Sequence, residues 1–230
     1  MTFQIGVVAS DGIILASDKK VVQVEDNIST CDSTQKITLS EDPPSMYCWA
    51  GDQTPGSVAR AFVHLAKTAE SIKVPWRADE LLHQAAHQVW TAAYGPKYPL
   101  VPTQVTLGHK GGSLLMAVKE GTGLGLWRMD YGADFPFRPV YCKSSTGNNC
   151  AVYLLERYYT RDLTIKELLP VLAHCIAMGG HINPSGVSGL EIAIWPNTDS
   201  RPAILPDAAI SALTERSAEI DIQVKQLLLP

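Results

Sequence analysis

Apolar residues recur along this chain with two different periods, and the order of those periods restricts the possible folds more than any other feature. Residues 3–50 contain short apolar, β-branched runs between turn signals, which are typical of strands. In residues 55–72 and 78–93 the apolar residues lie three and four positions apart, which indicates two helices. Both patterns then return. The chain therefore predicts strands, two helices, strands, two helices and a last group of strands.

The first group of predicted strands opens with a hairpin. Residues 3–9 and 13–17 are apolar runs on either side of Ser10-Asp11-Gly12, and an Asp-Gly pair between two such runs is a hairpin signal. The polar stretch 23–34 is interpreted as a loop. Strands are expected again at 35–39 and 46–50.

The second half of the chain repeats this arrangement. Thr164 and Glu167 have the spacing of a capping box, which predicts a helix start at that point. The expected elements are a hairpin of strands 104–109 and 113–118, strands 123–129 and 140–143 in the same sheet, helices 148–159 and 164–178, strands 189–195 and 201–205, and a tail, 208–229, read as helix then strand.

Two antiparallel sheets that face each other, with a helix pair on each outer face, would bury all of these apolar stripes. We therefore expect an α+β protein, specifically a four-layer αββα sandwich. The sequence contains no linker, low-complexity segment or short repeat, so residues 1–230 are expected to form a single domain.

The bulk composition excludes several classes of protein. Of the 230 residues, 46% are hydrophobic and 18% charged, which suits a sizeable apolar core. The net charge is −4 and the basic residues are scattered, so no nucleic acid partner is expected. Five cysteines without a CxxC pair favour neither disulfides nor structural zinc. Without a signal peptide or an apolar run of about 20 residues, we expect a cytoplasmic protein with no membrane partner.

The N-terminal segment resembles a known family. From Thr2 the chain runs through the predicted hairpin to Asp18, sixteen residues later. This resembles the opening of proteasome β-type subunits and of the bacterial proteasome-like (HslV-like) threonine peptidases. Four later motifs, in the same order as in that family, are similar as well: Lys36-Ile37, Ala50-Gly51, Ser145-Thr146-Gly147 and Asn183-Pro184-Ser185-Gly186.

The resemblance implies a fold, an activity and an assembly. Members are N-terminal-nucleophile hydrolases with the αββα fold, and they cleave polypeptides inside a chamber of stacked homo-oligomeric rings. They need no cofactor. Some receive substrates from an ATP-dependent unfoldase; since this chain has no P-loop, such a partner would be a separate protein.

The resemblance assigns the nucleophile to Thr2. A threonine hydroxyl needs a base, and an N-terminal threonine carries one in its own α-amine once Met1 is removed. Lys36 is expected beside the hydroxyl, where its charge favours the alkoxide, and Asp18 is expected to hold Lys36. The backbone N–H of Gly51, or that of Asp52, is the expected oxyanion donor.

The remaining site residues are also carried over from the family. Thr146 would replace the family's serine and bond the Thr2 amine, although it also suits a helix N-cap. Asn183 stands where the family has aspartate, and Ser185 follows in the same loop. The expected lining of the substrate-binding pocket is Val21, Thr34 and Trp49.

Other interpretations remain open. Lys36 could be a surface lysine, and Gly51 a turn glycine. A catalytically inactive scaffold subunit is compatible with Asn183, which cannot carry the charge of aspartate. A hydrolase of small amides would usually expose cysteine or serine in place of Thr2. His83 and His87 lie four residues apart, but no third ligand is evident, so no metal is expected.

Overall fold

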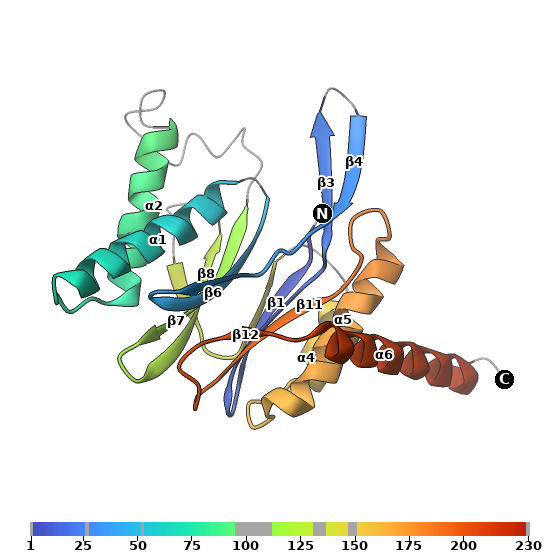
Figure 1. Ribbon diagram of the computed structural model, residues 1–230. Coiled ribbons are helices and arrows are strands. Elements are labelled where there is room, and N and C mark those ends of the chain that lie inside the picture. The colour runs from blue at the N-terminus through green and yellow to red at the C-terminus, as the bar shows by residue number, and fades with distance from the viewer. Residues whose placement is uncertain are drawn as a thin grey trace.

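The computed structural model describes residues 2–25, 28–51, 53–94, 112–130, 137–146 and 151–228. Within them the protein is α+β, with two five-stranded antiparallel sheets, a separate two-stranded hairpin and five helices. Helices α1 and α2 lie beside one sheet, α4 and α5 lie beside the other, and α6 packs against α5 (Figure 1). The hairpin extends away from both sheets, next to the N-terminus (Figure 1).

The first sheet contains the N-terminal hairpin, as predicted. β1 (Gln4–Ala9) and β2 (Gly12–Ser17) pair in antiparallel register, and the sheet order is β10-β1-β2-β11-β12. Gly12 is required at the turn because a Cβ there would overlap the carbonyl oxygen of Trp195. The other strands are β10 (Lys143–Thr146), β11 (Glu191–Pro196) and β12 (Ala203–Ile204).

The second sheet has the order β5-β6-β7-β8-β9, so each strand pairs with its neighbour in the chain. Its strands are β5 (Thr38–Glu41), β6 (Pro44–Ala50), β7 (Ser113–Glu120), β8 (Gly123–Asp130) and β9 (Phe137–Val140).

Four of the five helices follow the predicted segments. They are α1 (Thr54–Ser71), α2 (Ala78–Tyr94), α4 (Val152–Tyr158) and α5 (Ile165–Ile182). The capping box at the start of α5 is confirmed: the Thr164 hydroxyl accepts from the Glu167 N–H, and the Glu167 carboxylate accepts from the Thr164 N–H.

Three apolar clusters hold these elements together. One packs α4 and α5 against the first sheet, and another packs α1 and α2 against the second. The third joins the two sheets to each other through side chains such as Leu15, Met46 and Trp195. Cys48 and Cys175 are buried free thiols in these clusters. Each sheet is thus apolar on both faces, which is why its strands carry so few charged residues.

Residues 23–34 were predicted to be a loop, and this is wrong. β3 (Lys20–Glu25) and β4 (Ile28–Ser33) form a two-stranded hairpin there. Valine, isoleucine and threonine in this stretch favour strands despite its polar average. A ribbon that joins neither sheet needs no continuous apolar face, so the hydrophobic pattern did not reveal it.

Two other predictions are wrong. No single strand covers 140–143, because the chain leaves the second sheet after β9 and enters the first at β10. β7 pairs with β6 and β8, and residues 104–109, its predicted hairpin partner, lie outside the described residues. The tail is one helix, α6 (Asp207–Leu228), as far as residue 228.

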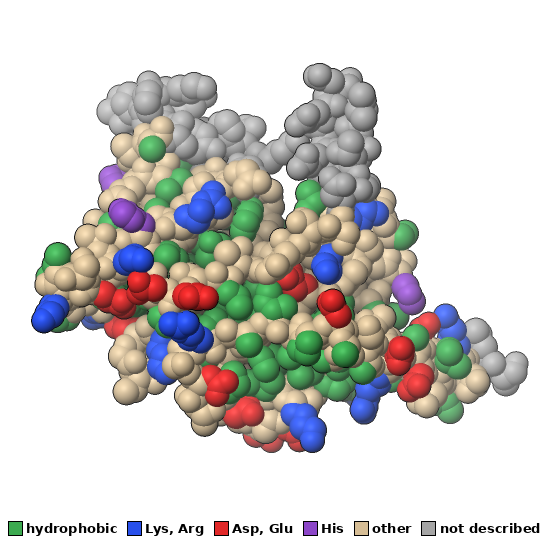
Figure 2. Space-filling view, viewed as in Figure 1, with side chains coloured by type: hydrophobic (Ala, Val, Ile, Leu, Met, Phe, Trp, Pro, Cys, Tyr) green, Lys and Arg blue, Asp and Glu red, His purple; other side chains and the backbone are tan. Residues whose placement is uncertain are grey.

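Positive and negative side chains are interspersed over the described part of the face in Figure 2. In the described ranges, no helix has both the length and the apolar character that a bilayer crossing demands.

Candidate active site

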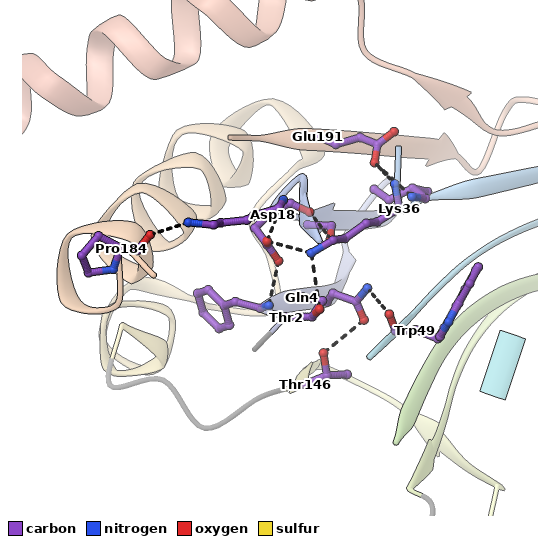
Figure 3. Close-up of polar contacts among 12 residues, drawn as sticks. Thr2, Gln4, Asp18, Lys36, Trp49, Thr146, Pro184 and Glu191 are labelled. Atoms are coloured by element: carbon purple, nitrogen blue, oxygen red, sulfur yellow. Dashed lines mark hydrogen bonds and ion pairs between the residues drawn. The ribbon is translucent and has the colours of Figure 1, made fainter. Parts of the chain in front are cut away.

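The ends of three segments bring Thr2, Asp18 and Lys36 together. Thr2 lies two residues before the start of β1 and Asp18 directly follows β2, and the pairing of Gln4 with Ser17 places these two ends side by side. Lys36 comes from the irregular segment between β4 and β5. All three side chains converge in Figure 3.

Lys36 connects the other two side chains. Its Nζ donates to Asp18 Oδ2 over 2.7 Å and to Thr2 Oγ1 over 3.3 Å. The Asp18 side chain is fully buried and that of Lys36 is 7% exposed, whereas Thr2 is partly exposed. The hydroxyl of a partly exposed threonine therefore lies against a buried cation.

Asp18 is held by backbone donors as well. Its Oδ1 accepts from the Phe3 N–H over 2.8 Å, and its Oδ2 accepts from the Lys20 N–H over 3.0 Å. The Lys20 ammonium points elsewhere, to the carbonyl of Pro184 at 2.8 Å (Figure 3). Of the nearby lysines, Lys36 is thus the one whose ammonium pairs with Asp18.

Burial shifts both members of this ion pair toward their neutral forms. Removal from water raises the pKa of Asp18 and lowers the pKa of Lys36, because each loses hydration of its charge. Their mutual hydrogen bond and attraction act in the opposite direction. A lysine with a lowered pKa gives up its proton more readily than a surface lysine does.

Glu191 was not foreseen, yet it contacts the same segment. It opens β11 and is 5% exposed, and its Oε2 accepts from the N–H groups of Lys36 at 2.8 Å and Ile37 at 3.0 Å. The available signal was a single charged residue at the start of the apolar run Glu191-Ile-Ala-Ile-Trp195. A buried charge in such a run usually has a specific partner.

Gln4 is a second residue that the sequence patterns did not reveal. Its side chain is fully buried, its Nε2 donates to the Trp49 carbonyl over 2.9 Å, and its Oε1 accepts from the Thr146 hydroxyl over 3.1 Å. Thr146 ends strand β10 and does not cap a helix, because α4 begins at Val152 with Ala151 as its N-cap. Gly147 lies outside the described residues.

Gly51 follows β6 with a φ of 99°, a conformation that residues with a Cβ rarely adopt. It is exposed, two residues beyond the Trp49 carbonyl that Gln4 holds. Asp52, the other expected oxyanion donor, lies outside the described residues. The role of either amide stays a prediction.

The expected pocket residues lie on two different parts of the structure. Val21 is a half-buried residue of β3, and Thr34 is exposed just after β4. Trp49 is half-buried in β6, and its ring packs where a Cβ on Gly56 would lie. Whether the three residues share one substrate pocket stays a prediction.

Asn183 and Ser185 lie at the end of α5. Asn183 is the C-cap residue, and the Ser185 hydroxyl donates to Asn183 Oδ1 over 2.9 Å. The intervening Pro184 accepts the bond from Lys20, whose backbone N–H reaches Asp18. This loop is therefore joined to the ion pair through Lys20.

Within the described residues, His83 and His87 do not belong to a group of side chains that could bind a metal ion. His83 Nδ1 contacts the Asp79 carbonyl at 2.6 Å, and the His83 ring packs edge-on against Phe137. Among the described residues, no group of three histidine, cysteine, aspartate or glutamate side chains could hold a metal ion.

Two solved structures resemble this chain over nearly its whole length. Anbu (ancestral beta-subunit) from Yersinia bercovieri has a TM-score of 0.72 and 15% identity, covering 100% of this chain and 98% of that one. A Gly-1 mutant of Anbu from Hyphomicrobium sp. strain MC1 has a TM-score of 0.71 and 15% identity, covering 98% of this chain and 97% of that one. At this identity the likeness shows a common fold.

The assignment to proteasome β-type subunits or HslV-like threonine peptidases is wrong. No protein-family model and no curated protein matches the sequence. The two solved structures named above are Anbu proteins, one of them described as an ancestral beta-subunit. The short motifs behind the assignment lie at strand ends and turns, such as Asp18 after β2 and Gly51 after β6.

Proposed function

We propose that this protein is a threonine-type peptidase whose nucleophile is Thr2, exposed as the first residue by removal of Met1. One observation carries the proposal: the Lys36 ammonium lies 3.3 Å from Thr2 Oγ1 and 2.7 Å from Asp18 Oδ2. A cation beside a hydroxyl lowers the cost of forming the alkoxide, and the buried carboxylate keeps the cation in position.

In the proposed reaction the neutral α-amine of Thr2 takes the proton of Oγ1, and Oγ1 attacks the carbonyl carbon of a peptide bond. The negative oxygen of the tetrahedral intermediate is stabilised by a backbone N–H, proposed to be that of Gly51. The C–N bond then breaks as the α-ammonium returns its proton to the leaving amine. Water, deprotonated by the same amine, hydrolyses the ester and regenerates Thr2.

The substrates are proposed to be polypeptides, with Val21, Thr34 and Trp49 around the side chain that precedes the cleaved bond. Thr146 is proposed to act through Gln4, and Asn183 and Ser185 through the Lys20 loop; their hydrogen bonds favour positioning roles.

The architecture is proposed to be one four-layer αββα domain. The support is that one apolar cluster lies between the sheets and one lies between each sheet and its helices.

Copies of this domain are proposed to assemble as a homo-oligomer that encloses the Thr2 sites. An assembly with rings and a separate unfoldase would confine cleavage to unfolded chains. The name ancestral beta-subunit, carried by one protein of like fold, supports the assembly.

The test combines the mass of the N-terminus with covalent labelling. The intact mass is expected to lack Met1, and an epoxyketone inhibitor, which needs both the hydroxyl and the free amine, is expected to form one adduct per chain. Thr2→Ala should abolish labelling and peptide cleavage, while Thr2→Ser, the matched control, should keep both. Absence of an adduct on wild-type protein that has lost Met1 would refute the proposal and favour an inactive scaffold.

A further inference from the structure

Lys36 lies in a segment that no sheet supports. Residues 34–37 have no strand assignment, and β5 begins only at Thr38. In a strand, the N–H groups of Lys36 and Ile37 would bond to a neighbouring strand. Here both donate instead to one side-chain oxygen, Oε2 of Glu191, over 2.8 and 3.0 Å. Figure 3 shows Glu191 on its strand, directed at the Lys36 backbone.

Glu191 is itself rigidly placed. It pairs with Ser17, the last residue of β2, across the β2–β11 ladder. Asp18 is the next residue in the chain after Ser17. Its residue is 5% exposed, and no lysine or arginine nitrogen among the described residues lies within 4.0 Å of its carboxylate. Among the described residues, the backbone amides of Lys36 and Ile37 are therefore the hydrogen-bond donors to this carboxylate.

The segment has other contacts as well. The Ile37 side chain is fully buried in the cluster between the two sheets. The Thr34 N–H donates to the Lys19 carbonyl over 2.9 Å, and Gln35 Nε2 donates to the Ile37 carbonyl over 2.9 Å. None of these contacts engages the backbone N–H of Lys36, which Glu191 accepts.

We infer that Glu191 is the positioning residue of the proposed reaction: its carboxylate holds the backbone of Lys36 and Ile37, so that the Lys36 ammonium reaches both Asp18 and Thr2. This role rests on the proposed function. Glu191 does not touch Thr2 in any recorded contact and acts through Lys36. Its negative charge also raises the pKa of Lys36, against the effect of burial.

Two substitutions separate the acceptor from the charge. Glu191→Gln keeps an oxygen that can accept both N–H groups but removes the charge. Glu191→Ala removes both. Misplacing a reacting group by about 1 Å can cost about 100-fold in rate, so we expect Glu191→Ala to lower kcat about 100-fold. KM should change less than threefold. Glu191→Gln should recover kcat to within tenfold of wild type.

A matched control exists in the second sheet. Glu120 Oε2 accepts from the Ala78 N–H over 3.1 Å at the start of α2, which is also a carboxylate bond to a backbone amide. Glu120→Ala should leave kcat unchanged. Circular dichroism and urea unfolding of all variants establish that each one is folded. Equal losses in Glu191→Gln and Glu191→Ala, or a kcat within threefold of wild type in folded Glu191→Ala, would overturn the inference.

A second measurement does not require activity. The ¹³Cε resonance of Lys36 reports its titration by NMR, and in Glu191→Gln the titration should move to lower pH because the nearby negative charge is gone. In Glu191→Ala the Lys36 resonance should shift toward that of a solvated lysine. If wild-type protein neither labels nor cleaves, the proposed function fails and this NMR comparison alone decides the role of Glu191. An unchanged Lys36 resonance in both variants would refute it.

Discussion

Asp18 and Phe3 exchange two hydrogen bonds: the Phe3 N–H donates to Asp18 Oδ1 over 2.8 Å, and the Asp18 N–H donates to the Phe3 carbonyl over 3.1 Å. Phe3 directly follows Thr2. The carboxylate that binds the Lys36 ammonium therefore also fixes the backbone next to the proposed nucleophile. One buried side chain, that of Asp18, thus positions both the Lys36 ammonium and the backbone that carries the Thr2 hydroxyl.

Asp18→Asn should lower kcat/KM by about 100-fold or more, within the range of general acid–base contributions. It should also reduce the free energy of unfolding by about 3–5 kcal/mol, because the buried Lys36 charge loses its partner. Urea unfolding and peptide-cleavage kinetics measure the two effects. Asp79→Asn, which removes an exposed pair with Arg77, should barely change the urea midpoint.

The double variant Asp18→Asn/Lys36→Met distinguishes charge from packing. It should regain part of the lost stability, since no unpaired charge remains buried, but none of the activity. A double variant no more stable than Asp18→Asn would contradict the assignment of the loss to the unpaired lysine.

The pH dependence of kcat/KM should be bell-shaped. Activity should rise as the α-amine of Thr2 loses its proton, at about pH 7.7–8.0 for an ordinary α-amine. It should fall when Lys36 loses its own proton. Because burial lowers the pKa of Lys36, the falling limb is expected below 10.5, the ordinary value for lysine. Peptide cleavage between pH 6 and 10.5 checks this, and a plateau that extends to about pH 10.5 would speak against a catalytic Lys36 charge.

Gly51→Ala should reduce kcat about 10²–10³-fold if the Gly51 amide stabilises the oxyanion, since a Cβ would force the backbone away from its φ of 99°. Gly121→Ala is the matched control. Gly121 also has a positive φ, 59°, with open space where a Cβ would lie. Both substitutions should cost about 1–2 kcal/mol of stability. If the two variants have comparable kcat values, the Gly51 amide does not stabilise the oxyanion.

The packing of α6 on α5 should weaken in mild acid. His174 Nδ1 contacts the Ser217 hydroxyl at 2.9 Å, and Asp221 and His181 are the nearby charged groups. Burial lowers the pKa of His174, so the unfolded chain binds the proton more tightly than the folded one. Stability is thus fully present above 6.5, the ordinary pKa, and is lost as pH falls from there toward the lowered value.

Hydrogen exchange of α6 amides at pH 7.5 and pH 5.5, each corrected for intrinsic rates, measures this effect. Protection of α6 should fall more at the lower pH in wild type than in His174→Gln. Identical pH responses in the two proteins would argue against His174 as the titrating group.

The sequence predicted those features that depend on local pattern. The N-terminal hairpin follows from the Asp-Gly turn, α1 and α2 from apolar spacing, and the start of α5 from the Thr164 capping box. Thr2, Asp18 and Lys36 were expected together from the resemblance, and the structure places the Lys36 ammonium within hydrogen-bond distance of both other side chains. Their catalytic roles stay a prediction.

Long-range features were beyond such patterns. Glu191 meets the Lys36 segment across 155 residues, and Gln4 meets Thr146 across 142. Neither pairing leaves a periodic signal, since it depends on how the sheets are ordered. The same limit explains the switch of sheets between β9 and β10, which occupies only residues 141 and 142. Family membership was inferred from short motifs at strand ends and turns, and no family model or curated protein matches the sequence.

Lys36 and Glu191 lie 155 positions apart in the chain, and this separation sets an order of events during synthesis. A ribosome adds about 5–20 residues per second, so the glutamate emerges roughly 8–30 seconds after the lysine. Until then β2 lacks its β11 neighbour and the lysine segment lacks its acceptor. A nascent chain therefore carries the side chains of Thr2, Asp18 and Lys36 before it carries Glu191, which is proposed to position Lys36. Translation itself therefore delays the completion of the proposed active site until Glu191 has been made.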